Sequence, residues 1–192
     1  LALTAYQVML SRYSQQEDVY VGFAHAQRPR PELDGMIGMF AGYFVIRGDL
    51  SGTPSFREVL GQMRTACLEA FEHQGLPHVE LMKLLPGVCK VGFTFSNREG
   101  QLSGVPGLDV RPVMMTRGVS LYDVKLSMFE GPEGLGGSFE YRTELFAPET
   151  IHARRACFEA RLTHAVSEPE RPVRQLAASH PAPEPSSRKR AV

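Results

Sequence analysis

The chain has 192 residues, of which 43% are hydrophobic and 22% are charged, and its 21 Lys and Arg residues balance its 21 Asp and Glu residues. This length suits one domain, or one lobe of a larger domain, with a substantial buried core. A net charge of zero gives no global field to attract nucleic acid or an anionic membrane, and no stretch approaches the roughly 20 apolar residues that span a bilayer, so we expect neither partner.

The three cysteines are Cys67, Cys89 and Cys157. None forms a C-x-x-C pair or has histidines nearby at the spacing of a zinc site. We therefore expect free thiols in a reducing cytoplasm, with no metal site and no disulfide framework.

The first part of the chain predicts helices and strands joined by an ordered loop. The expected elements are a helix over Leu1 to Tyr13, a strand over Val19 to Phe23, a loop over Ala24 to Gly38, a strand between Ile37 and Leu50, and a helix from Ser55. The loop contains Arg-Pro-Arg-Pro, which cannot be helical because proline lacks an amide proton and restricts the residue before it. Ser55 and Glu58 form a predicted capping box. The apolar side of the second helix is expected to be Phe56, Val59, Leu60, Met63, Cys67, Ala70 and Phe71.

The rest of the chain alternates strands with helices. The expected elements are a short helix over His78 to Leu85, strands over Val91 to Asn97, Leu108 to Val113, Val124 to Glu130 and Gly137 to Tyr141, and a last helix from Pro148 with Ile151, Phe158, Leu162 and Ala165 on its buried side. A loop is expected over Gly100 to Gly107. A turn at Gly131 to Gly134 predicts an antiparallel hairpin. The pattern favours an α/β fold, a two-layer sandwich of a mixed β-sheet with long helices.

Beyond Val173 the composition shifts to Pro, Ala, Ser and basic residues. We expect a folded unit over residues 1–175 and a disordered Pro/Ser/basic tail over residues 176–192. The basic cluster near the end of this tail is either an interaction patch or simply solvated chain.

Five pieces of sequence, taken in order, carry a family resemblance. They are DVYVGFAHAQR from Asp18, RPELDGMIG from Arg30, IGMFAGYFVIR from Ile37, HQGLP from His73 and SFEYRTELF from Ser138. Together they resemble the C-terminal lobe of the condensation domains of nonribosomal peptide synthetases, which share the chloramphenicol acetyltransferase-like fold. The resemblance runs from about Leu1 to Val173.

The resemblance implies a reaction and its partners. Condensation domains join an upstream acyl or peptidyl thioester to the amine of a downstream aminoacyl thioester, each delivered on the phosphopantetheine arm of a carrier protein. Their H-H-x-x-x-D-G motif lies in the N-terminal lobe, and we expect this chain to begin inside the domain, without that lobe. The histidines here are single: His25, His73, His78, His152, His164 and His180. We therefore assign no catalytic residue, and expect the chain alone to be inactive; whether it serves an enzyme stays open.

The residues matched to the family's motifs form a candidate tunnel or carrier-adjacent set. These are Gly22, Arg28, Gly38, Gly42, Tyr43, Arg47, His73 and Gln74. The arginines suit a phosphopantetheine phosphate or a carrier surface, since guanidinium binds oxyanions with two parallel hydrogen bonds, but they equally suit loops held through carbonyls and carboxylates. The glycines allow the backbone to approach the tunnel or simply form turns. His73 and Gln74 either cap the helix end or take part in chemistry.

Three departures from the family pattern stand out. Gly42 and Tyr43 replace an asparagine and a threonine near the expected tunnel, a family element between Leu85 and Val91 is shortened, and Arg142 replaces an asparagine. Three functions remain in competition: the C-terminal lobe of an active condensation domain, a non-catalytic remnant or carrier-docking module, and an acyltransferase of the same superfamily that uses coenzyme A.

Overall fold

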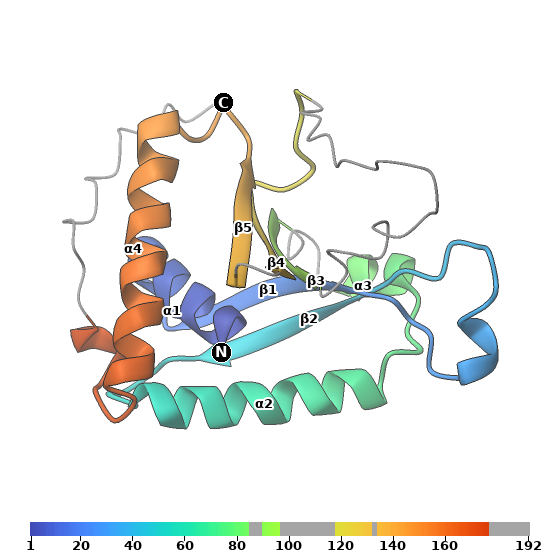
Figure 1. The fold of residues 1–192 in the computed structure, drawn as a ribbon, viewed down its shortest axis with the longest axis horizontal. Helices are drawn as coiled ribbons and strands as arrows, with labels where there is room; N and C mark the ends of the chain where they lie inside the picture. The colour runs from blue at the N-terminus through green and yellow to red at the C-terminus, as the bar shows by residue number, and fades with distance from the viewer. Residues whose placement is uncertain (85–89, 97–117, 132–133, 177–192) are drawn as a thin grey trace. The chain divides into compact units, whose positions relative to one another are not determined.

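The computed structural model describes residues 1–84, 90–96, 118–131 and 134–176. Its elements, labelled in Figure 1, are α1 (Ala2–Ser14), β1 (Asp18–His25), η1 (Pro31–Leu33), β2 (Gly42–Asp49), α2 (Phe56–Glu72), α3 (His78–Leu84), β3 (Val91–Ser96), β4 (Val124–Gly131), β5 (Gly134–Tyr141), α4 (Pro148–Ser167) and η3 (Val173–Gln175). The helices and strands follow the order expected from the sequence.

Within the described residues, the strands form one five-stranded sheet in the order β2-β1-β3-β4-β5. β1 pairs with β3 in parallel, with Gly22 opposite Gly92, and β3 pairs with β4 in parallel. β4 and β5 form an antiparallel hairpin in which Gly131 lies opposite Gly134. The predicted mixed sheet and its hairpin are confirmed, and β5 begins three residues before the predicted Gly137.

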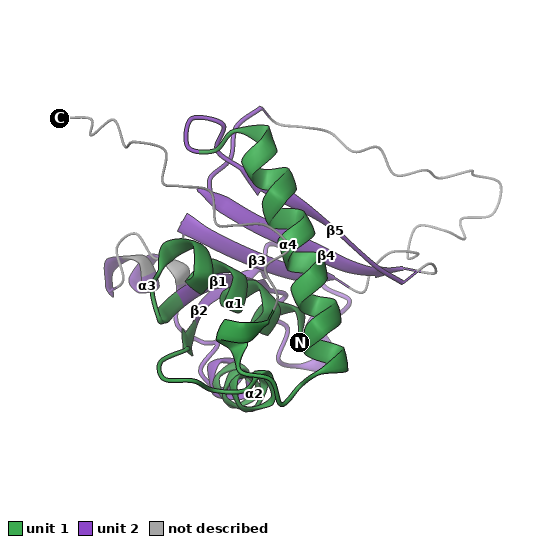
Figure 2. Cartoon of the chain, turned by 90° about the vertical axis from the view of Figure 1, so that its left-hand side faces the viewer, with its two compact units in different colours: residues 1–19, 47–67, 146–192 green, residues 20–46, 68–145 purple. Residues whose placement is uncertain are grey.

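The chain divides into two compact units, coloured separately in Figure 2. Unit 1 comprises residues 1–19, 47–67 and 146–192, and it holds α1, α4 and most of α2. Unit 2 comprises residues 20–46 and 68–145, and it holds most of the sheet.

In unit 1, α1 packs against α4 and is buried over most of its length. The burial includes two polar side chains, Thr4 and Gln7, both 0% exposed. Gln7 donates from Nε2 to the carbonyl of Val19 at 3.4 Å. An amphipathic pattern with one apolar face does not predict the burial of Thr4 and Gln7, because the helix is enclosed on several sides.

The buried side of α4 contains the predicted Ile151, Phe158 and Ala165, while Leu162 is only half-buried. It also contains Cys157 and Arg161, 3% and 2% exposed. Nε of Arg161 donates to Sγ of Cys157 at 3.1 Å. A buried arginine is rare and was not predicted from the helical pattern.

The predicted capping box at the start of α2 is confirmed. The backbone N–H of Ser55 donates to Oε2 of Glu58 at 2.7 Å, and the backbone N–H of Glu58 donates to Oγ of Ser55 at 3.2 Å. On the apolar side Phe56, Val59 and Met63 are buried. The later members of the predicted side are less covered: Leu60, Cys67 and Ala70 are half-buried and Phe71 is 43% exposed.

The chain stays packed to Leu176, which is 2% exposed and lies one residue past the predicted boundary of the folded unit. The rest of the predicted tail, the expected strand over Leu108 to Val113, the loop over Gly100 to Gly107, Cys89 and His180 lie outside the described residues. Within the described part of the chain, Cys67 and Cys157 are free thiols. No helix of that part is both long and apolar enough to cross a membrane.

Candidate functional site

Two of the sequence-predicted residues of unit 2, Gly42 and Tyr43, lie at the start of β2, beside the end of β1. His25 is the last residue of β1, and Gly42 is the first of β2. Aromatic rings fill the space beside them: Phe23 stacks on Phe44 with centroids 5.4 Å apart, and Phe71 meets the Phe44 ring edge-on at 5.0 Å. Phe93 of β3 lies 5.8 Å from Phe23. We call Phe23, His25, Phe44, Phe71 and Phe93 the ring cluster.

His25 is the titratable member of the ring cluster. Its imidazole stacks on Phe44 at 4.5 Å between centroids, and Nδ1 accepts a hydrogen bond from the backbone N–H of Gln27 at 3.2 Å. A neutral imidazole in this position therefore carries its proton on Nε2, an atom that is buried and has no hydrogen-bond partner among the described residues. Burial lowers the pKa of His25 below its ordinary value of 6.5, because desolvation disfavours the cation.

Gln27 connects this site to the end of α2. Its side-chain Nε2 donates to the backbone carbonyl of Gln74 at 2.9 Å, and its own backbone is left-handed, with φ of 46°. A non-glycine residue in that region is held there by its surroundings. The predicted His73 is exposed, and its backbone N–H donates to the carbonyl of Glu69 within the helix.

Gly42 is buried, and the space above its Cα is already occupied. A Cβ there would lie 2.5 Å from Nε2 of His25 and 2.7 Å from Oε1 of Gln27. Gly42 stands where the family pattern has an asparagine, and His25 and Gln27 leave no room for a side chain at this position. The substitution has a local physical reason, which the sequence pattern alone does not supply.

Arg28 holds the loop that follows β1. Its Nη2 donates to the carbonyl of Met36 at 2.9 Å, and its guanidinium lies 4.1 Å from the centroid of Phe40. Nη1 is buried and has no hydrogen-bond partner in the described part of the chain. Gly38, in the same loop, is exposed.

Tyr43 meets Tyr122, which sequence reasoning did not single out. The two hydroxyls are in hydrogen-bond contact, and the rings stack with an interplanar angle of 16°. Nζ of Lys125 lies 5.3 Å from the centroid of the Tyr122 ring. The hydroxyl of Tyr43 is therefore engaged by a second tyrosine within unit 2.

Two other predicted residues, Gly22 and Arg47, do not contact the ring cluster through any interaction described above. Gly22 is buried within β1, opposite Gly92 of β3. Arg47 belongs to unit 1, where Nε and Nη2 bind the two carboxylate oxygens of Asp18 at 2.8 and 3.1 Å. Arg28 thus binds a backbone carbonyl and Arg47 binds a carboxylate. This is the structural role that the sequence offered as the alternative to phosphate or carrier binding. A ligand role for either residue stays a prediction.

His25, Gln27 and Tyr122 are the site residues that sequence reasoning did not single out. One signal was available, because strand alternation places His25 on the side of Val19, Val21 and Phe23. Nothing in the sequence marks Tyr122. Across the described ranges, no cluster of three or more His, Cys, Asp or Glu side chains has the placement to hold a metal ion.

A family model for the condensation domain matches residues 1–183. The chain belongs to the condensation-domain family. It is 34% identical over 173 residues to tyrocidine synthase 2 of Brevibacillus parabrevis, covering 86% of this chain and 5% of that protein. It is also 34% identical over 179 residues to malpinin synthetase of Mortierella alpina, covering 89% of this chain and 2% of that protein.

Solved structures share the fold of this chain. The X-domain from teicoplanin biosynthesis superposes with a TM-score of 0.80 at 26% identity, over 92% of this chain and 43% of that one. The same type of domain in complex with OxyB gives 0.79 at 25% identity, over 94% of this chain and 42% of that one. The chain thus spans less than half of these solved domains and a few per cent of the curated synthetases. Its predicted α/β fold with a mixed sheet is confirmed.

Proposed function

We propose that this chain is the C-terminal lobe of a condensation domain that forms amide bonds between carrier-bound thioesters. In that reaction the amine of an aminoacyl thioester attacks the carbonyl of an acyl or peptidyl thioester. A C–N bond forms, the C–S bond breaks, and the thiol of the upstream phosphopantetheine arm leaves. The observation that carries the proposal is the match of residues 1–183 to the condensation-domain model.

The proposed lobe works with an N-terminal lobe. The sequence contains no H-H-x-x-x-D-G motif, and it spans 43% of the solved X-domain. General base catalysis requires a group within hydrogen-bond reach of the attacking amine, and we assign that group to the other lobe. The proposed partners are peptidyl and aminoacyl carrier domains with their phosphopantetheine arms, and the proposed compartment is the cytoplasm.

The residues of this chain would then shape the tunnel rather than transfer protons. Gly22, Gly38, Gly42 and Tyr43 are proposed to lie beside the tunnel, with the side chains of His25 and Gln27 covering Gly42 and the Tyr122 hydroxyl in contact with Tyr43. Arg28 and Arg47 are the proposed contacts to a carrier or to its phosphate. The ion pair of Arg47 with Asp18 is exposed, with 60% and 44% of the two side chains accessible, so a phosphate can compete for this guanidinium.

Reconstitution tests the reaction. This chain is mixed or co-expressed with an N-terminal lobe that carries H-H-x-x-x-D-G, and loaded donor and acceptor carriers are added. We expect the amide product by mass spectrometry only when both lobes are present. Product from the N-terminal lobe alone at the same rate would overturn the proposal.

A second candidate is a non-catalytic docking module, and one observation favours it. The likeness to the teicoplanin X-domain includes a structure solved as a complex with OxyB. By analogy, this chain would bind a carrier or another protein without forming an amide. Saturable binding of a partner, together with no amide in the reconstituted system, would select this candidate.

A further inference from the structure

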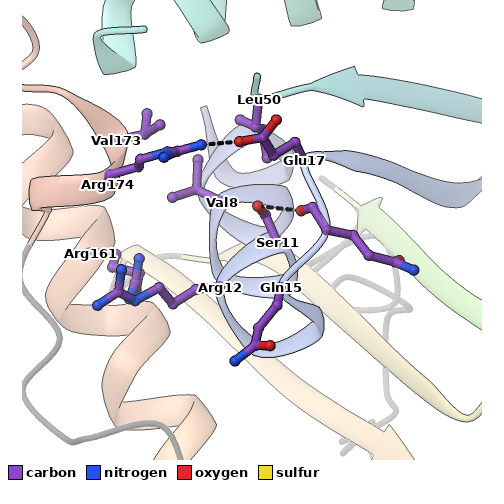
Figure 3. A pocket seen from close by; sticks show the side chains of 10 residues that line it. Val8, Ser11, Arg12, Gln15, Glu17, Leu50, Arg161, Val173 and Arg174 are labelled. Carbon is purple, nitrogen blue, oxygen red and sulfur yellow. Dashed lines mark hydrogen bonds and ion pairs between the residues drawn. The ribbon is translucent and has the colours of Figure 1, made fainter. Parts of the chain in front are cut away.

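Unit 1 contains a hollow of about 380 Å³ that no part of the proposed reaction uses. It is lined by the C-terminal half of α1, by the segment that follows it, and by residues of α4 and η3. Figure 3 shows its side chains, of which Arg12, Glu17, Arg161 and Arg174 are charged.

The charges around this hollow do not balance. Of its three arginines, Arg174 is paired with Glu17, the one carboxylate in the lining (Figure 3). Neither Arg12 nor Arg161 has an ion pair within the described ranges. Two guanidinium charges are therefore left without a counter-charge in the described part of unit 1.

Arg161 makes the hollow a built site rather than a surface cluster. Its side chain is 2% exposed, and Nη2 is buried with no hydrogen-bond partner among the described residues. Its Nε is held by the thiol of Cys157 at 3.1 Å, so the guanidinium is fixed in place. A buried cation without a partner is costly, and an anion in the hollow would remove that cost.

We propose that this hollow binds the phosphate group of a small ligand, held by Arg12 and Arg161. A phosphate ester carries a charge of about −1.5 to −2 at neutral pH, which matches the two unpaired guanidinium groups, whereas a carboxylate supplies only one charge. Guanidinium forks bind phosphate oxygens through paired hydrogen bonds. The volume is in the range of small-molecule pockets, so the phosphate has room for an attached organic group. This site is independent of the amide-forming reaction.

The test is a calorimetric titration of the full chain with inorganic phosphate, with acetate at the same ionic strength as the comparison. We expect saturable phosphate binding and much weaker acetate binding. Equal binding of the two anions, or no phosphate binding at millimolar concentration, would overturn the proposal.

Variants assign the binding to the hollow. Arg12 is exposed, so Arg12→Gln is expected to fold normally and to weaken phosphate binding by about tenfold or more. Arg161→Met is the second variant, used if circular dichroism shows that it folds. Arg155→Gln is the matched control, because Arg155 lies on α4 but pairs with Glu159 outside the hollow. Unchanged binding in Arg12→Gln, or an equal loss in Arg155→Gln, would contradict the assignment.

A phosphate ester then tests the attached group. Phenyl phosphate is expected to bind at least as tightly as inorganic phosphate and to lose affinity in the same variants. Its exclusion would overturn the assignment to a small organic ligand.

Discussion

The position that a Cβ of Gly42 would occupy lies 2.5 Å from Nε2 of His25. The last residue of β1 and the first residue of β2 thus fit together only because one of them has no side chain. Neither facing side chain is free to withdraw at no cost, because His25 stacks on Phe44 and Gln27 donates to the carbonyl of Gln74.

Gly42→Ala should therefore destabilise the chain by about 1 to 3 kcal/mol, the range for an overpacked interior. Gly61→Ala is the matched control, since Gly61 lies exposed inside α2 with nothing within 4 Å of its Cβ position. That change should stabilise the helix by about 0.5 to 1 kcal/mol. Urea unfolding measures both, and a Gly42→Ala variant as stable as the wild type would show that the site relaxes freely.

The burial of His25 makes stability depend on pH. Because its folded-state pKa lies below the ordinary value of 6.5, the unfolded chain takes up the proton first as the pH falls. The unfolding free energy should decline from about pH 7 downward, through the folded-state pKa of His25. In His25→Gln this part of the decline should vanish.

The exposed His152 on α4 provides the control for the pH experiment. His152→Gln should retain the wild-type slope of unfolding free energy against pH. An unchanged slope in His25→Gln would indicate that other groups cause the pH dependence.

Variants of the ion pair between Arg47 and Asp18 can distinguish a structural role of Arg47 from a role in carrier binding. Both side chains are largely exposed, so Arg47→Gln should cost less than about 1 kcal/mol of stability. If Arg47 binds the carrier, the same change should weaken the chemical-shift response of a phosphopantetheinylated carrier protein titrated with this chain. Asp18→Asn, which removes the carboxylate charge that pairs with Arg47, should leave that response equal or stronger.

Arg57→Gln serves as the control for this titration, because Arg57 is another exposed arginine of unit 1 with its own carboxylate partner, Glu170. A carrier response that weakens equally in Arg47→Gln and Arg57→Gln would indicate general electrostatic attraction instead of a site.

The capping box gives a prediction about α2 alone. Ser55→Ala removes the hydroxyl that accepts from the backbone N–H of Glu58, and should cost about 1 kcal/mol in thermal or urea unfolding. Thr65→Ala on the same helix removes only a hydroxyl that donates to the carbonyl of Gly61, and should not destabilise, because alanine is the better helix former. A Ser55→Ala variant with wild-type stability would contradict the expected contribution of the cap.

The elements that were predictable from sequence depend on neighbours close along the chain. The capping box of Ser55 and Glu58, the start of α4 at Pro148 and the hairpin between β4 and β5 all belong to this class. The candidate site was less predictable, since His25 owes its surroundings to Phe44 and Phe71, which are distant in sequence. Arg161 was missed for the same reason: helical periodicity describes one stripe, and it gives no sign of a polar group enclosed beside a hollow.

The strand order also bears on how the sheet is assembled during folding. The β4–β5 hairpin pairs strands that are adjacent in the chain, with Gly131 opposite Gly134, whereas β1 pairs with β3, which is distant in the chain, with Gly22 opposite Gly92. Loop closure must precede such non-local pairing, and parallel pairing adds no short turn to assist it. We therefore expect the hairpin to be protected from hydrogen exchange first, and the β1–β3 ladder to form slowly, as the step that commits the sheet to its final order.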